Sequence, residues 1–254
     1  MTYLEYLLLF IIFPIIVASW YLVRSFRESS RNTIIDPRYI IVSLVILSII
    51  AFLYTTPWDN YLVASGIWSY KPNQILGIII GYVPIEEYSF FILETILVGL
   101  LTFIILLKFP IKIPETMDYG ITKEKLILLG YFFVIWVTML VLFVCDYPSY
   151  KYMSLILVWA LPPIVLQLLV GWDIIFTNFK KILALIVTTG FYLSVTDFIA
   201  ISLNIWEINA NYIINLNIGV LPFEEILFFY VTTILITFGT ILFNYYLKMR
   251  LERS

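Results

Sequence analysis

Seven long apolar stretches constrain the fold of this chain more than any other feature of its sequence. A bilayer core of about 30 Å needs about 20 apolar residues per helix, and a spanning helix satisfies its own backbone hydrogen bonds. We therefore expect an all-α membrane protein with seven transmembrane helices. The expected spans are Tyr3 to Val23, Tyr39 to Thr55, Glu86 to Leu107, Lys125 to Cys145, Tyr152 to Trp172, Ile182 to Ile201 and Glu224 to Leu247.

Composition agrees with a membrane protein and excludes several classes of function. The 254 residues are 62% hydrophobic and 13% charged, which is far more apolar than a soluble domain. A net charge of -2 argues against a nucleic-acid partner. With no histidine and a single cysteine, Cys145, we expect no metal site, no intramolecular disulfide and no Ser-His-Asp triad. The N-terminal stretch lacks a basic leader, so we interpret it as a retained span.

The distribution of basic residues predicts the orientation, because Lys and Arg in short loops stay on the cytoplasmic side. Thirteen of them fall in the first, third and fifth loops and the C-terminal tail, against two, Lys71 and Lys151, in the other loops. We expect the N-terminus outside, the C-terminus in the cytoplasm and a multi-pass location in the cell membrane. The thirteen are Arg24, Arg27, Arg31, Arg38, Lys108, Lys112, Lys123, Lys125, Lys180, Lys181, Lys248, Arg250 and Arg253.

The chain also contains an internal repeat. A shift of 138 residues aligns Asp59 to Thr95 with Asp197 to Thr233 without a gap, and 13 of 37 positions are identical. A weaker match at a shift of 149 pairs Tyr3 with Tyr152 and Pro14 with Pro163. We predict two parallel three-helix repeats, residues 1–123 and 149–254, joined by a linking helix within 124–148. The identical pairs at the shift of 138 are Asp59/Asp197, Ile67/Ile205, Trp68/Trp206, Asn73/Asn211, Ile75/Ile213, Ile80/Ile218, Gly81/Gly219, Pro84/Pro222, Glu86/Glu224, Glu87/Glu225, Phe90/Phe228, Phe91/Phe229 and Thr95/Thr233.

The segment between the second and third spans mixes β-branched residues, glycine and a turn signal at Lys71-Pro72-Asn73. Unpaired strands cannot face lipid, because their backbone groups would lack hydrogen-bond partners. We expect a short hairpin or a re-entrant cap over the outer mouth, with a copy at Asn204 to Pro222.

Two pairs of adjacent glutamates occupy matching places in the repeat, as Pro84-Ile85-Glu86-Glu87 and Pro222-Phe223-Glu224-Glu225. Proline followed by acids is typical of a helix start, so the glutamates alone could serve only to begin two helices. Ionisable groups inside a membrane are costly, however, and usually functional.

Helical spacing places each pair beside aromatic rings. Glu87, Phe90, Phe91 and Glu94 share one face, and the second half repeats the face as Glu225, Phe228, Phe229 and Thr232. Apolar surroundings favour the protonated form of a carboxyl, and ring faces attract a cation without offering it a nucleophile. An acid beside rings therefore suits a cationic intermediate.

The repeated Pro-x-Glu-Glu motif, with Trp58-Asp59 and Gly66-Ile67-Trp68 upstream, closely resembles the integral-membrane lycopene cyclases of the heterodimeric and fused type. These occur as two small subunits in actinobacteria and as one fused chain in archaea and fungi. The resemblance covers nearly the whole chain, including the duplication.

The resemblance implies a lycopene beta-cyclase, an isomerase (intramolecular lyase) that converts the ψ ends of lycopene to β-ionone rings through γ-carotene to β-carotene. It implies that Glu86, Glu87, Glu224 and Glu225 are catalytic and that the site holds no metal. The partners implied are lycopene, the lipid bilayer and other carotenoid-pathway enzymes. Because the chain lacks a dinucleotide-binding glycine fingerprint, we predict no flavin or other cofactor. The supporting or substrate-binding residues are Asp59, Asp197, Trp68, Trp206, Phe90, Phe91, Glu94, Phe228 and Phe229.

Three alternatives compete with this interpretation. A sibling carotenoid enzyme, such as a hydratase or an ε- or monocyclase, would differ only in where the cation is quenched. A proton-coupled transporter would also use paired acids, but would spread polar residues over several spans, whereas these acids cluster near one end. A retinal protein would need a lysine in mid-span, and the lysine nearest the last span is Lys248, at its end.

Overall fold

The computed structural model describes residues 1–28, 37–114, 117 and 120–251, and these residues contain seven helices long and apolar enough to cross a membrane. The all-α membrane fold is thereby confirmed. Two of the basic residues used for orientation, Arg31 and Arg253, lie outside the described residues, as do the side chains of Arg27, Arg38, Lys248 and Arg250. The helices are α1 (Tyr3–Tyr6), continued by a π-helical turn (Leu7–Ile12) and α2 (Phe13–Glu28), then α3 (Pro37–Ala64), α4 (Ile85–Lys108), α5 (Lys123–Val144), α6 (Lys151–Thr177), α7 (Phe179–Ser202) and α8 (Phe223–Leu251).

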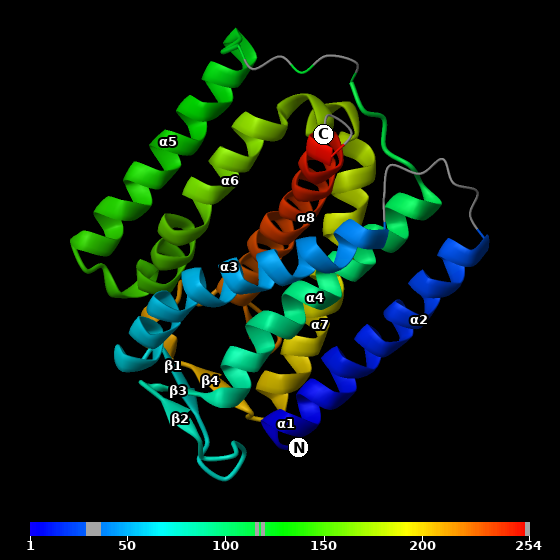
Figure 1. The fold of residues 1–254 in the computed structure, drawn as a ribbon. Coiled ribbons are helices and arrows are strands. Elements are labelled where there is room, and N and C mark those ends of the chain that lie inside the picture. The colour runs from blue at the N-terminus through cyan, green and yellow to red at the C-terminus, as the bar shows by residue number, and fades with distance from the viewer. Residues whose placement is uncertain (29–36, 115–116, 118–119, 252–254) are drawn as a thin grey trace.

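Helices α4 and α8 lie at the centre of the bundle and pack against each other (Figure 1). These are the two helices that begin with the glutamate pairs. Close approach to their neighbours depends on small residues, because a Cβ atom at Gly99 of α4 would meet Leu44 of α3, and one at Gly171 of α6 would meet Leu242 of α8. Small residues at such contacts are typical of helix packing in membranes.

Helix α5 has no buried side chains within its apolar stretch and packs along α6 at the edge of the bundle (Figure 1). Its exposed residues are large and apolar, such as Tyr131, Phe133 and Val134. The surface of the described spans is thus apolar while acids lie inside, which suits a protein surrounded by lipid.

Short strands gather at one end of the bundle, which we call the hairpin end; the N-terminus lies there and α8 ends at the opposite side (Figure 1). β2 (Ile79–Ile80) pairs with β3 (Val83–Pro84), and β5 (Asn217–Ile218) pairs with β6 (Leu221–Pro222). Gly81 and Gly219 form the two tight turns at φ +66° and +64°, a conformation that favours glycine. The expected hairpins are therefore present, although each is only two residues per strand.

A third strand pair was not expected. β1 (Trp68–Tyr70) pairs antiparallel with β4 (Trp206–Ile208), so the segments before the two hairpins join one half of the chain to the other. This pairing carries Trp68 and Trp206 over the ends of the central helices.

The second span differs from its prediction. We expected it to end at Thr55, but α3 continues to Ala64 with Pro57 inside the helix. A proline is tolerated in a transmembrane helix where neighbours satisfy the freed backbone groups. As a consequence Trp58 and Asp59 lie on the inner face of a helix, both buried, and not in the loop that follows.

Candidate active site between the two halves

Each glutamate pair begins its helix in the same way, and its first member holds the preceding loop. Pro84 is the N-cap of α4, and the Glu86 Oε1 atom accepts the amide N–H of Leu76 at 2.5 Å. In α8 the Glu224 Oε1 atom accepts the amide N–H of Ile214 at 2.7 Å. Leu76 and Ile214 are related by the same shift of 138 residues as the glutamates. Glu86 and Glu224 therefore bind backbone groups and stand apart from the interior cluster.

The second members point inward and line one small cavity between the halves. Glu87 and Glu225 face it together with Asp197, among the rings of Phe90 and Phe229. The cavity volume is about 10 Å³, close to the space that one water molecule needs. The structure thus brings together Glu87 and Glu225 from opposite halves and separates each from its sequence neighbour.

Two tyrosines hold Glu87, and sequence reasoning assigned neither of them to the site. The Tyr3 hydroxyl donates to Glu87 Oε2 at 2.6 Å, and the Tyr70 hydroxyl donates to the same oxygen at 2.9 Å. Burial raises the pKa of Tyr70 well above its usual range, and the nearby Glu87 charge adds to the effect, so Tyr70 keeps its proton and remains a donor.

Glu225 has a related but looser environment. The hydroxyl of Tyr152 lies near Glu225, yet among the described residues it has no partner in full hydrogen-bond geometry. The shift of 149 residues aligns Tyr3 with Tyr152. This weak repeat between the first and fifth spans was the sequence signal that could have assigned both tyrosines to the site.

The two aspartates also lie beside the inner glutamates. Asp59 interacts electrostatically with Glu87, and Asp197 with Glu225. Asp197 Oδ1 accepts the Trp206 indole N–H at 2.9 Å. Neither oxygen of Asp59 has a hydrogen-bond partner among the described residues. The two halves are therefore similar in residue type and different in hydrogen bonding.

These acids are deeply buried, and the described residues place no cation among them. Exposure is 0% for Asp59 and Asp197, 1% for Glu225 and 4% for Glu87. The ion pairs described in the structure, Lys71 with Glu207 and Lys151 with Asp146, lie at the hairpin end outside this cluster. Adjacent buried carboxylates cannot all be ionised without a compensating charge, so a cluster of this kind holds protons.

Aromatic rings enclose the acids and cross between the halves. Trp68 of the first half packs edge-on against Tyr152 and Phe228 of the second, with ring centroids 5.8 and 6.0 Å apart. Trp206 of the second half packs against Tyr3 of the first at 5.0 Å. Neither half alone would enclose its own acids.

The remaining sequence-predicted residues take part in the same core. Phe90 and Phe229 meet edge to face at 6.1 Å, which joins α4 to α8. The Thr232 hydroxyl donates to Glu94 Oε1 at 2.8 Å, so these two residues, aligned by the repeat, contact each other directly. Phe91 lies beside Phe90. Within the described part of the chain, no group of three or more His, Cys, Asp or Glu residues could hold a metal ion.

The fold and the site define a multi-pass membrane protein that buries protonatable acids among aromatic rings. The chain is 32% identical over 202 residues to the lycopene beta-cyclase of Halobacterium salinarum, which covers 80% of this chain and 82% of that protein. The chain therefore belongs to the lycopene beta-cyclase family, and the resemblance carried by the Pro-x-Glu-Glu motifs is confirmed.

Fungal relatives extend the comparison. The chain is 33% identical over 211 residues to a bifunctional lycopene cyclase/phytoene synthase of Podospora anserina and 28% identical over 223 residues to one of Phaffia rhodozyma. It covers 35% and 32% of those proteins, so it spans about a third of their length. No family model matches the chain. No solved structure matches it.

Proposed function

We propose that this protein is a lycopene beta-cyclase of the cell membrane, which converts the ψ end groups of lycopene to β-ionone rings, giving γ-carotene and then β-carotene. The observation that carries the proposal is the pairing of Glu87 with Glu225, one from each half, in a cluster of buried acids to which no described residue contributes a cation. Acids held in this way keep protons that a double bond can take up. Family membership supplies the substrate class.

The reaction is redox-neutral. A protein acid protonates the terminal double bond, and the resulting tertiary cation is attacked by a double bond further along the chain, which closes the six-membered ring. Loss of a proton from the ring re-forms a double bond, so the product is an isomer of the substrate. No electrons are exchanged, and the reaction needs only an acid, a base and a surface that tolerates positive charge. On this basis the protein is an isomerase (intramolecular lyase).

We assign the proton donors to Glu87 and Glu225, which share one cavity, with Asp59 and Asp197 as the groups that relay protons to them. Glu86 and Glu224 act as positioning residues through the loop amides that they bind. Trp68, Trp206, Phe90, Phe91, Phe228 and Phe229 shape the site and stabilise the cation through their π faces.

We also propose that residues 1–123 and 149–254 are parallel repeats joined by the helix within 124–148, with the hairpin end outside. The matched contacts of Glu86 and Glu224 support this division. The bilayer is the second partner, and other enzymes of the carotenoid pathway are expected to deliver lycopene or receive its product.

Expression in a bacterium that accumulates lycopene tests the proposal. The pigment should change from lycopene to β-carotene on chromatography. A double variant, Glu87→Gln with Glu225→Gln, at the same membrane level should leave lycopene unchanged. Unchanged lycopene with the natural sequence would contradict the proposal, and a hydrated or ε-ring product would identify a sibling enzyme.

A further inference from the structure

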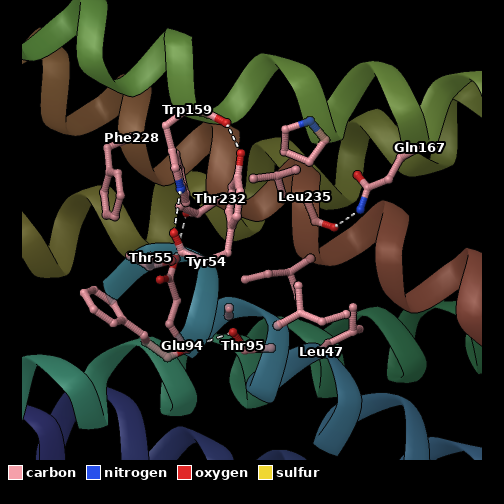
Figure 2. Close-up of a pocket in the computed structure, with 15 residues that line it drawn as sticks. Leu47, Tyr54, Thr55, Glu94, Thr95, Trp159, Gln167, Phe228, Thr232 and Leu235 are labelled. Carbon is pink, nitrogen blue, oxygen red and sulfur yellow. Dashed lines mark hydrogen bonds between the residues drawn. The ribbon is translucent and has the colours of Figure 1, made fainter. Parts of the chain in front are cut away.

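A second cavity lies deeper in the bundle, between α3, α4, α6 and α8 (Figure 2). We call it the Glu94 cavity. Its volume is about 110 Å³, and its walls are mostly apolar, with Phe91 and Phe228 among them. An apolar cavity of about 150 Å³ holds a benzene ring, so the Glu94 cavity would have to widen to take a six-membered carbon ring that carries methyl groups. The cavity at Glu87 and Glu225, at about 10 Å³, is far too small for such a ring.

One acid faces this apolar space. Among its fifteen lining residues Glu94 is the sole carboxylic acid, and it extends from α4 toward Thr232 of α8 (Figure 2). The hydrogen bond from the Thr232 hydroxyl, at 2.8 Å, fixes the side chain from the opposite half. The repeat aligns Thr232 with Glu94, so the second half has a threonine at this position instead of a glutamate. The contact between the halves therefore consists of one carboxylic acid and one hydroxyl donor. A hydroxyl that donates to a carboxylate stabilises its ionised form, and this offsets part of the cost of ionising a carboxyl among apolar walls.

The cavity borders the lipid on the side of α3. Tyr54 and Ile50, which line it, are 43% and 47% exposed on the outer surface of the spans. Tyr54 and Trp159 bridge α3 and α6 there, since the Tyr54 hydroxyl donates to the Trp159 carbonyl at 2.9 Å and the Trp159 indole N–H donates to the Tyr54 carbonyl at 3.4 Å. A hydrocarbon dissolved in the bilayer would meet the cavity at this bridge, and parting of the bridge would admit it without a passage through water.

The Glu94 cavity also adjoins the acid cluster. Phe228 lines both spaces, and its ring stacks on Trp58 at 5.5 Å with an interplanar angle of 6°. Phe228 is therefore a wall common to the Glu94 cavity and to the cavity at Glu87 and Glu225. Rotation of that ring would join the two spaces.

We propose that the Glu94 cavity takes one end group of the polyene directly from the lipid and that the Glu94 carboxylate accepts the proton that leaves the new ring. This inference rests on the proposed cyclase function. Once the Phe228 ring has turned aside, the terminal double bond takes a proton from the acid cluster, the carbon–carbon bond of the ring forms, and the cation moves onto the ring. A ring C–H bond then gives its electron pair to the new double bond and its proton to Glu94. One proton enters and one leaves, so atoms and charge balance.

A cavity-filling variant tests the binding part. Ala51 lines the cavity, and Ala51→Phe places a ring inside it. Ala184 lies exposed on α7, so Ala184→Phe makes the same chemical change on a surface outside the cavity. Each variant is purified from a lycopene-accumulating strain, and total bound carotenoid per protein is measured by extraction and absorbance.

We expect Ala51→Phe to lower both bound carotenoid and conversion by about tenfold or more, while Ala184→Phe stays within about twofold of the natural protein. Equal binding and conversion by the two variants would overturn the inference while leaving the cyclase function intact. If Ala51→Phe does not accumulate in the membrane, the smaller change Ala51→Leu carries the same comparison. If the natural protein fails to convert lycopene, the proposed function is wrong. The comparison of bound carotenoid between the two variants still tests whether the cavity binds the polyene.

The product tests the role of Glu94. A cation that cannot give its proton to Glu94 is quenched elsewhere, so Glu94→Gln should yield products with a displaced double bond or an added hydroxyl, or bound but unconverted lycopene. Glu94→Asp should restore part of the β-ring product. A merely structural role would lower the amount of folded protein without changing the product. β-Carotene at the natural rate and proportion from Glu94→Gln would refute the assignment.

Discussion

The two members of each glutamate pair should respond differently to the same substitution. Glu87→Gln keeps the shape of the side chain and an oxygen that can accept the Tyr3 and Tyr70 hydroxyls, which donate at 2.6 and 2.9 Å. It removes only the proton that the side chain can give. General acid catalysis contributes about 10²- to 10⁴-fold to a rate, so the barrier should rise by about 3–5 kcal/mol.

Glu86→Gln provides the matched control. Glu86 accepts one backbone N–H, from Leu76, and the glutamine oxygen can accept it as well. Weakening of one hydrogen bond of this kind costs about 1 kcal/mol. Even if that loss appeared fully in the rate, the activity would fall less than about tenfold. The same contrast should hold between Glu225→Gln and Glu224→Gln.

The assay measures initial rates of lycopene loss and β-carotene formation in membranes that contain equal amounts of each variant. Rates should fall by at least about a hundredfold for Glu87→Gln and Glu225→Gln and by less than about tenfold for the other two. Equal losses within a pair would refute the division between proton donors and positioning residues. Full activity in all four variants would return the pairs to a role in starting helices.

Three further predictions concern stability, pH and cofactor content. Gly81→Ala should lower stability by about 1–2 kcal/mol, because φ is positive at Gly81 and the new Cβ would meet Asn60. Gly130→Ala should not lower stability, because the space around Gly130 is open. Thermal unfolding in detergent compares the two variants. The raised pKa of Tyr70 means that its phenol stabilises the fold fully below about pH 10 and loses that contribution as the pH rises through the raised value. The unfolding midpoint of Tyr70→Phe relative to the natural protein should therefore be constant from about pH 6 to 9 and improve at more alkaline pH, and a pH-independent difference would contradict the argument. Purified protein should show no flavin absorbance, and a stoichiometric flavin would refute that expectation.

The spans could be predicted because the bilayer imposes both their length and their apolar surface, and neither depends on distant contacts. The end of α3 could not, since Pro57 reads as a helix breaker until neighbouring helices satisfy the backbone around it. The pairing of β1 with β4 was beyond prediction for a similar reason. Each strand has three residues, and only the meeting of the two halves in space gives them partners.

The acids illustrate the same limit within the site. Helical spacing correctly placed Glu87, Phe90 and Glu94 on one helix, but it could not tell which member of a pair faces the interior. That choice follows from the loop before each helix, whose amide group binds Glu86 or Glu224 and turns the next residue inward. The tyrosine on Glu87 comes from the first span, 84 residues away in the chain.

The proposed duplication, followed by divergence, would explain why the two halves share one site and differ at Glu94 and Thr232. Two identical halves facing each other would place Glu94 against a second glutamate, and two buried carboxylates in contact cannot both be ionised. With Thr232 in the second half, the contact becomes a hydrogen bond from a hydroxyl to a single carboxyl group, the group to which we assign the role of proton acceptor. The inner pairs at Glu87 and Glu225 keep their acids in both halves and so retain protons to give. Conversion of a hydrocarbon to its cyclic isomer needs both a proton donor and a proton acceptor, and in the proposed assignment the inner glutamates supply the donor and Glu94 the acceptor.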